Sequence, residues 1–135
     1  MTLLASWVAV DSRGIQSMYM ASDSCISWEN NKKCNFLHYQ KLYACKKKAE
    51  MFGFCGEVHF TSSILRQVVD LIDNGLMFKL GYSAQQKAQT ILSFIQENYD
   101  KYPDYTKKSN LSINIIYCFR AKGGKRQTKA ENFRA

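Results

Sequence analysis

The chain has 135 residues, of which 46% are hydrophobic and 22% are charged, and its formal net charge is +8. This length and composition are those of one folded domain, so they exclude a disordered chain. The positive charge keeps nucleic acid among the partners to consider, but much of it lies in the tail that begins at Arg120. We therefore rank nucleic-acid binding last among the candidate functions.

The cysteines and histidines do not form a pattern typical of a metal or cofactor site. Five cysteines are spread through the chain without a CxxC pair, and the only histidines are His38 and His59. Such spacing is typical of reduced thiols in a cytoplasmic protein and not of a disulfide framework or a zinc site. The apolar run at residues 3–10 is too short for a membrane span, which needs about 20 apolar residues. We expect no metal, no cofactor and no membrane association.

The first part of the chain has the pattern of β-strands. Residues 3–10 and 17–24 are two β-rich runs, and the sequence DSRG at residues 11–14 provides a turn between them. A turn centred near Arg13 and Gly14 places residue 2 opposite residue 25. After a polar loop at residues 29–35, two more runs at 41–45 and 51–55 flank a lysine triplet. We expect two antiparallel hairpins.

From residue 61 the apolar period changes to three and four residues, which is typical of an amphipathic helix. Thr61 or Ser62 is its expected N-cap, and DNG at residues 73–75 is its expected end. A second helix should begin at Ser83, where Gln86 completes a capping box, and run until Pro103. Residues 111–119 then alternate like a half-buried strand. This order of elements predicts an α+β fold with helices on one face of an antiparallel sheet.

The opposite face of that sheet is apolar as well. Trp7, Val8, Ala9 and Val10 place apolar side chains on both sides of their strand. A second sheet, a partner chain or sequence beyond residue 135 has to cover them. We expect the chain to form a homo-oligomer or to bind a partner subunit.

The strand at residues 17–24 carries a carboxylate near its end, Asp23, within the stretch SMYMASDSCISW. Serine and aspartate are common strand terminators, so a turn cap is one interpretation. Together, however, the hairpin SWVAVDSRG…MYMASDS, KLY at residues 41–43 and MFGFCGEV at residues 51–58 suggest another. In this ordered set the chain resembles the proteasome-type N-terminal nucleophile (Ntn) hydrolases, the four-layer αββα family of the 20S proteasome β subunits and their bacterial two-ring relative.

The resemblance covers residues 2–119 and implies an Ntn-like core over residues 1–119. That core would be an antiparallel β-sheet sandwich flanked by helices (αββα), incomplete in this chain. Residues 120–135 would then be a basic polar tail or the start of a missing C-terminal half.

The resemblance also implies a catalytic set of four residues: Thr2 as the nucleophile, Asp23, Lys41, and Gly56 beside the oxyanion. After removal of Met1, the amine of Thr2, with an ordinary pKa of about 7.7 to 8.0, could take the proton of its own hydroxyl. The Lys41 ammonium would favour the neutral amine and the developing alkoxide, and Asp23 would hold Lys41 in place. The implied activity is hydrolysis of a peptide or amide substrate through an acyl-enzyme on Thr2.

Some features depart from the family pattern. The interval from Thr2 to Asp23 is a few residues longer than usual, and Ser6 lies nearer the usual spacing. The later strands and helices that supply a serine and an aspartate beside the amine are missing. Lys41 and Gly56 also have simpler interpretations, as a surface lysine and as relief of a tight bend. Two alternatives stay open: a non-catalytic assembly subunit on the same fold and, ranked last, a basic module that binds nucleic acid through its tail.

Overall fold

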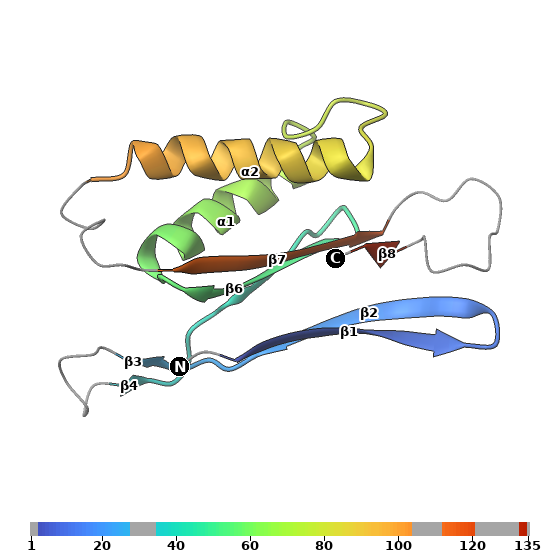
Figure 1. Ribbon diagram of the computed structural model, residues 1–135, viewed down its shortest axis with the longest axis horizontal. Helices are drawn as coiled ribbons and strands as arrows, with labels where there is room; N and C mark the ends of the chain where they lie inside the picture. Colours follow the sequence, from blue (N-terminus) through green and yellow to red (C-terminus); the bar gives the residue numbers. More distant parts are fainter. Residues whose placement is uncertain (1–2, 28–34, 104–111, 121–132, 135) are drawn as a thin grey trace.

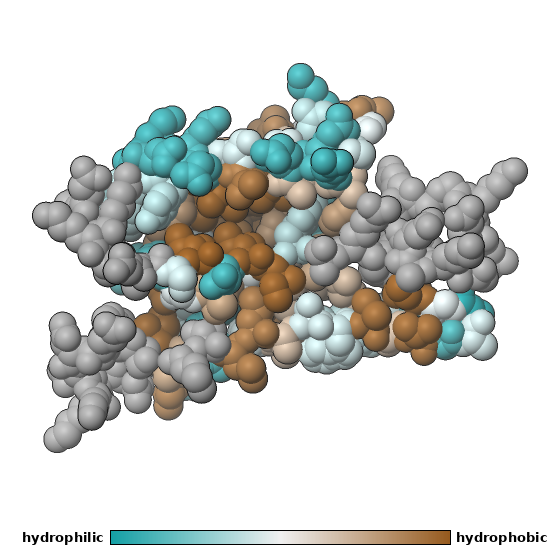
Figure 2. Space-filling view, in the orientation of Figure 1, coloured by the Kyte–Doolittle hydropathy of each residue, from teal (hydrophilic) through white to brown (hydrophobic). Residues whose placement is uncertain are grey.

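A computed structural model describes residues 3–27, 35–103, 112–120 and 133–134 of the chain. These residues form an α+β fold with antiparallel sheets and two helices, which confirms the predicted fold class at this level. Figure 1 shows three layers: two helices cover one face of a four-stranded sheet, and a two-stranded hairpin lies on the opposite face. In Figure 2 the outer side of the helix layer is mostly hydrophilic, whereas hydrophobic side chains reach the surface over the sheets.

The hairpin consists of β1 (Leu4–Asp11) and β2 (Gly14–Ser22), which pair antiparallel as predicted. The predicted register is wrong by one residue, because Leu4 pairs with Ser22 and not with Asp23. The turn is centred on residues 12 and 13, and a further shift of register occurs between Ala9 and Val10. An irregularity of this kind within a ladder reassigns the partners of all residues beyond it.

The four-stranded sheet has the order β5 (Leu42–Ala44), β6 (Glu50–Gly56), β7 (Ile113–Arg120) and β8 (Phe133–Arg134), with every neighbouring pair antiparallel. It contains the second predicted hairpin, β5–β6, and the strand predicted after the helices, β7. The strand β8 was not predicted; it lies within residues 120–135, which we expected to be a basic polar tail or the start of a missing C-terminal half. A short pair, β3 (Ile26–Ser27) and β4 (Asn35–Phe36), flanks the predicted polar loop, most of which lies outside the described residues.

The first helix, α1 (His59–Asp73), begins earlier than predicted. The Glu57 carboxylate accepts hydrogen bonds from the backbone N–H groups of His59, Phe60 and Thr61, at 2.8, 2.8 and 3.2 Å. An acidic side chain just before a helix therefore caps it, and the predicted N-cap at Thr61 or Ser62 is wrong. The predicted end is confirmed.

The second helix, α2 (Ala84–Asp100), has the predicted capping box. The Gln86 N–H donates to the Ser83 hydroxyl at 3.2 Å, and the Ser83 N–H donates to the Gln86 side chain at 2.8 Å. Both backbone donors are therefore satisfied at the start of the helix.

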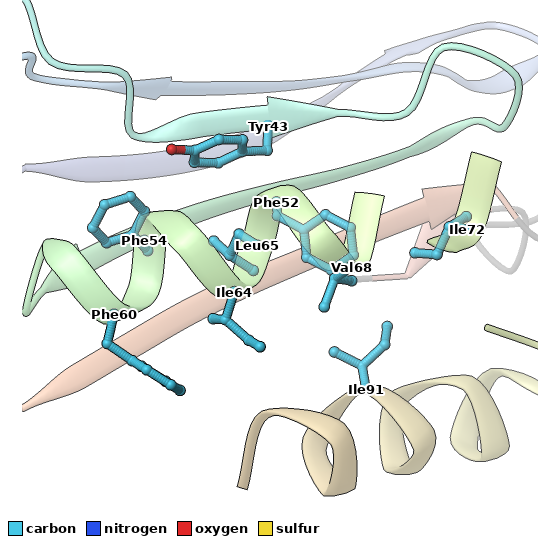
Figure 3. Close-up of a cluster of buried hydrophobic side chains, with 9 residues drawn as sticks. All are labelled: Tyr43, Phe52, Phe54, Phe60, Ile64, Leu65, Val68, Ile72 and Ile91. Atoms are coloured by element: carbon cyan, nitrogen blue, oxygen red, sulfur yellow. The ribbon is translucent and has the colours of Figure 1, made fainter. Parts of the chain in front are cut away.

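The main core lies between the helices and the four-stranded sheet (Figure 3). On β6, Phe52 and Phe54 alternate toward the helices and are fully buried, while Gly53 between them faces the hairpin. A Cβ atom at Gly53 would lie 2.4 Å from the Met20 Sδ and 2.6 Å from the Leu4 Cδ1. The missing side chain at Gly53 thus allows the hairpin to approach the sheet. The buried hydrophobic cluster comprises Tyr43, Phe52, Phe54, Phe60, Ile64, Leu65, Val68, Ile72 and Ile91.

The outer face of the hairpin carries two exposed aromatic rings. Trp7 and Tyr19 pair across β1 and β2, and their rings stack with centroids 5.7 Å apart. They are 50% and 46% exposed, so the described part of the chain leaves this face largely uncovered. We expected the strand that carries Trp7 in the helix-covered sheet, but β1 and β2 form a sheet of their own, so the uncovered apolar face is the outer face of the hairpin. That another chain or segment covers this outer face stays a prediction.

Candidate functional site

Lys41, which directly precedes β5, is buried in spite of its charge, and only 1% of its side chain is exposed. Its Nζ atom donates to the Asp23 Oδ1 at 2.8 Å and to the Cys25 carbonyl oxygen at 2.6 Å. A buried ammonium needs such partners, because it has lost the water that would otherwise solvate it. The interpretation of Lys41 as a surface lysine is therefore wrong. The pairing with Asp23 that the resemblance implied is present.

Backbone hydrogen bonds hold the two segments of this ion pair in place. The Phe54 N–H donates to the Lys41 carbonyl at 3.2 Å, which fixes Lys41 against β6. The Tyr39 N–H donates to the Ser24 carbonyl at 2.9 Å, and the Ser24 hydroxyl donates to the Leu37 carbonyl. The segment after β2 thus runs beside the segment before β5. This arrangement places the ammonium next to the carboxylate.

The start of the chain reaches the same place. The Asp23 N–H donates to the Leu3 carbonyl oxygen at 3.1 Å, which extends the pairing of the hairpin beyond Leu4 and Ser22. Thr2, the predicted nucleophile, lies outside the described residues. Its neighbour Leu3 is therefore the nearest point at which the structure relates the N-terminus to the ion pair.

Gly56 lies at the end of β6, two residues beyond Phe54, and has a positive φ of 105°. A Cβ atom on this residue would lie 1.7 Å from the carbonyl oxygen of Ser112. Both the backbone conformation and the close approach of the Ser112 backbone require glycine here. The interpretation of Gly56 as relief of a tight bend therefore has direct support. Its role beside an oxyanion stays a prediction.

The other residues that the sequence singled out are not part of the ion pair. Ser6 lies within β1, opposite Met20 of β2. His38 and His59 are exposed. Among the described residues, no group of three or more histidine, cysteine, aspartate or glutamate side chains could hold a metal ion.

Sequence reasoning missed a second buried charge cluster, at the other end of β6. Glu50 is 6% exposed, and its two carboxylate oxygens accept from the Lys87 Nζ at 2.5 Å and from the Tyr117 hydroxyl at 2.7 Å. Burial and the hydrogen bond to this carboxylate raise the pKa of Tyr117. The alternation of side chains along β6 was a sequence signal for this cluster, because it places Glu50 on the same strand face as Phe52 and Phe54. The Cys25 carbonyl, in contrast, has no sequence signal, since every residue carries that group.

Burial also raises the pKa of the nearby Cys45 thiol, to about 12, with the carboxylates of Asp73 and Glu50 adding to the effect. A thiol in this state is protonated at neutral pH and is a poor nucleophile. Cys45 is therefore not a candidate for nucleophilic catalysis.

The chemistry available at the Asp23–Lys41 pair is electrostatic. It provides a fixed positive charge, shielded from water, beside the first residues of the chain. In the described part of the chain, no helix is long and apolar enough to cross a membrane. No family model, no curated protein and no solved structure matches this chain.

Proposed function

We propose that this chain is a proteasome-type Ntn hydrolase domain that cleaves amide or peptide bonds through an acyl-enzyme on Thr2. The observation that carries the proposal is the buried ion pair of Lys41 and Asp23, with Asp23 bonded through its backbone to Leu3. Carboxylate, ammonium and N-terminal segment thereby meet at one point. The stacking of one helix layer on two sheet layers in the described part of the chain supports three of the four layers of the αββα architecture.

In the proposed reaction, the free amine of Thr2 accepts the proton of the Thr2 hydroxyl while its oxygen attacks the substrate carbonyl carbon. The Lys41 ammonium favours the alkoxide that develops on Thr2, and the Gly56 N–H donates to the substrate oxyanion. The protonated amine then gives its proton to the leaving nitrogen as the amide bond breaks. Water hydrolyses the resulting ester and regenerates the threonine. The scheme requires the Thr2 side chain to lie on the face of β1 that carries Leu4, toward β6.

The test is the state and reactivity of the N-terminus. Intact-mass spectrometry should show a chain without Met1, and a peptide epoxyketone should form an adduct that maps to Thr2. The Thr2→Val variant, which keeps the shape but lacks the hydroxyl, should give no adduct. The matched control Thr90→Val, on α2, should react like the wild type. A retained Met1 would refute the proposal, because a blocked amine cannot act as the base.

The exposed outer face of the hairpin favours a second candidate, a non-catalytic assembly subunit on the same fold. Stacked, half-exposed rings such as Trp7 and Tyr19 are typical of surfaces that bind another protein. This candidate predicts a stable oligomer by native mass spectrometry and no epoxyketone adduct. The Trp7→Ser variant should lower the oligomer mass while the circular dichroism spectrum stays unchanged. A wild type that is monomeric at micromolar concentration would refute this alternative.

A further inference from the structure

A cavity of about 870 Å³ lies at the end of β6 that is remote from Lys41. The turn between β5 and β6, the loop between the helices, the start of α2 and the end of β7 surround it. Figure 1 shows that these four segments meet at the same end of the helix and sheet layers. The volume is within the range of small-molecule sites, roughly 300–1,000 Å³.

The lining of this cavity is strongly basic. Among the described residues that line it, Glu50 is the single carboxylate, and its two oxygens already bind Lys87 and Tyr117. The other charged residues of the lining are cations, and they come from four separate segments of the chain. Like charges gathered in one concave surface repel each other, and a bound anion would offset that repulsion. The basic residues that line the cavity are Lys47, Lys48, Lys79, Lys87 and Arg120.

The start of α2 adds to the positive potential. The N-terminus of a helix carries a partial positive charge and is usually accompanied by acidic side chains. The first turn of α2 contains no acidic residue, and Lys87 stands there instead. Ser83 and Ala84, at the beginning of this helix, line the cavity. The sequence thus places a cation where an isolated helix would favour an anion.

Parts of the cavity wall are held in place by contacts within the protein. The Asp73 carboxylate accepts from the backbone N–H groups of Lys46 and Lys47, at 2.8 Å each, and these bonds fix the turn between β5 and β6. The Lys87 ammonium lies 4.8 Å from the centre of the Phe78 ring and is paired with Glu50. Preorganised groups of this kind lose little entropy when a ligand binds.

We propose that this cavity binds a small anion with several negative charges, of the polyphosphate class. Phosphate oxygens accept charge-assisted hydrogen bonds from lysine and arginine, and they suit the N-terminus of a helix. The site is separate from the proposed chemistry of Thr2. The Thr2→Val variant should therefore bind the anion like the wild type.

The test is isothermal titration calorimetry of the full chain with sodium tripolyphosphate at low ionic strength. The wild type should show saturable binding. The double variant Lys47→Gln/Lys79→Gln should lose at least about tenfold in affinity, because two cations of the lining are lost. The charge-matched control Arg13→Gln/Lys101→Gln, at the hairpin turn and the far end of α2, should change affinity by no more than about twofold. Circular dichroism checks that each variant is folded.

Two results would overturn the proposal: no saturable binding to the wild type at low salt, or equal loss of affinity in the cavity variant and the control. The second would show a response to net charge only. A titration with ATP distinguishes the source of the phosphates. Affinity equal to that of tripolyphosphate supports a site for the phosphate chain alone, and tighter binding supports a nucleotide. Binding of an oligonucleotide that tripolyphosphate does not displace would contradict a small-anion site.

Discussion

The buried ion pair leads to an asymmetric prediction, in which losing the carboxylate harms the fold more than losing the lysine. The Asp23→Asn variant keeps the shape of the side chain but removes the carboxylate charge that faces the Lys41 ammonium, and the Lys41 side chain is only 1% exposed. Breaking a buried pair in this way costs about 3–5 kcal/mol. The asparagine oxygen can still accept one hydrogen bond from Lys41. We therefore expect a loss of about 3 kcal/mol in the free energy of unfolding, at the lower end of that range.

The Lys41→Met variant should cost less. The Asp23 carboxylate that it leaves behind is 30% exposed and can be solvated by water. The variant also removes the cost of burying an ammonium, which offsets part of the lost hydrogen bonds to Asp23 and Cys25. We expect a loss of about 1–2 kcal/mol. The double variant should be about as stable as Lys41→Met alone, which gives a coupling energy of about 3 kcal/mol, the full cost of Asp23→Asn.

Urea unfolding followed by far-UV circular dichroism measures these differences, with the m-value as a check on two-state behaviour. The exposed ion pair of Asp11 and Arg13 is the control, and Asp11→Asn should lower the free energy of unfolding far less than Asp23→Asn, because water solvates both of its charges. A smaller cost for Asp23→Asn than for Lys41→Met, or effects that simply add in the double variant, would contradict the predicted asymmetry.

Three other predictions test local features. Gly56→Ala should cost about 3 kcal/mol or more in the free energy of unfolding, because the new Cβ would meet a backbone oxygen. The control Gly81→Ala, also at positive φ but in open space, should cost only about 1 kcal/mol. Equal costs for the two variants would contradict this prediction. Glu57→Gln should lower the melting temperature by weakening the cap of α1, a loss of about 1 kcal/mol, and Glu97→Gln on α2 serves as its control. The pKa of Cys45 is raised to about 12 from an ordinary value of 9.0, so the folded state favours the neutral thiol. Stability should therefore decline as pH rises from about 9 toward 12, since the unfolded chain loses this proton first; a Cys45→Ala variant with the same decline would contradict that assignment.

Helices and strands could be predicted from the sequence because apolar residues repeat every two positions in strands and every three or four in helices. Boundaries were less accurate where a group outside the element defines them. Glu57, which lies before α1, caps that helix with its carboxylate, so the helix begins at His59 and not near Thr61. The predicted hairpin register was wrong because the turn is centred one position earlier than expected, which moves the partners beside the turn by two residues. The shift between Ala9 and Val10 reverses one of those two and has no signature in the residues themselves.

The candidate site was predicted only in part. The resemblance implied that Asp23 and Lys41 would meet, and the structure places them 2.8 Å apart. It could not show that Lys41 is buried or that the Cys25 carbonyl is its second partner, because both depend on the packing of the hairpin against the sheet. The glycine at position 56 has a structural cause that involves Ser112, a residue 56 positions later in the chain.

Local sequence was sufficient for the order of the longer strands and the two helices, for the capping box at Ser83 and for the presence of two apolar sheet faces. Each of these depends on residues close together in the chain. Packing between distant segments, in contrast, sets which member of each ion pair is buried, namely Lys41 beside Asp23 and Glu50 beside Lys87. Desolvation acts on groups that packing brings together, and the partners of these pairs lie 18 and 37 residues apart in sequence.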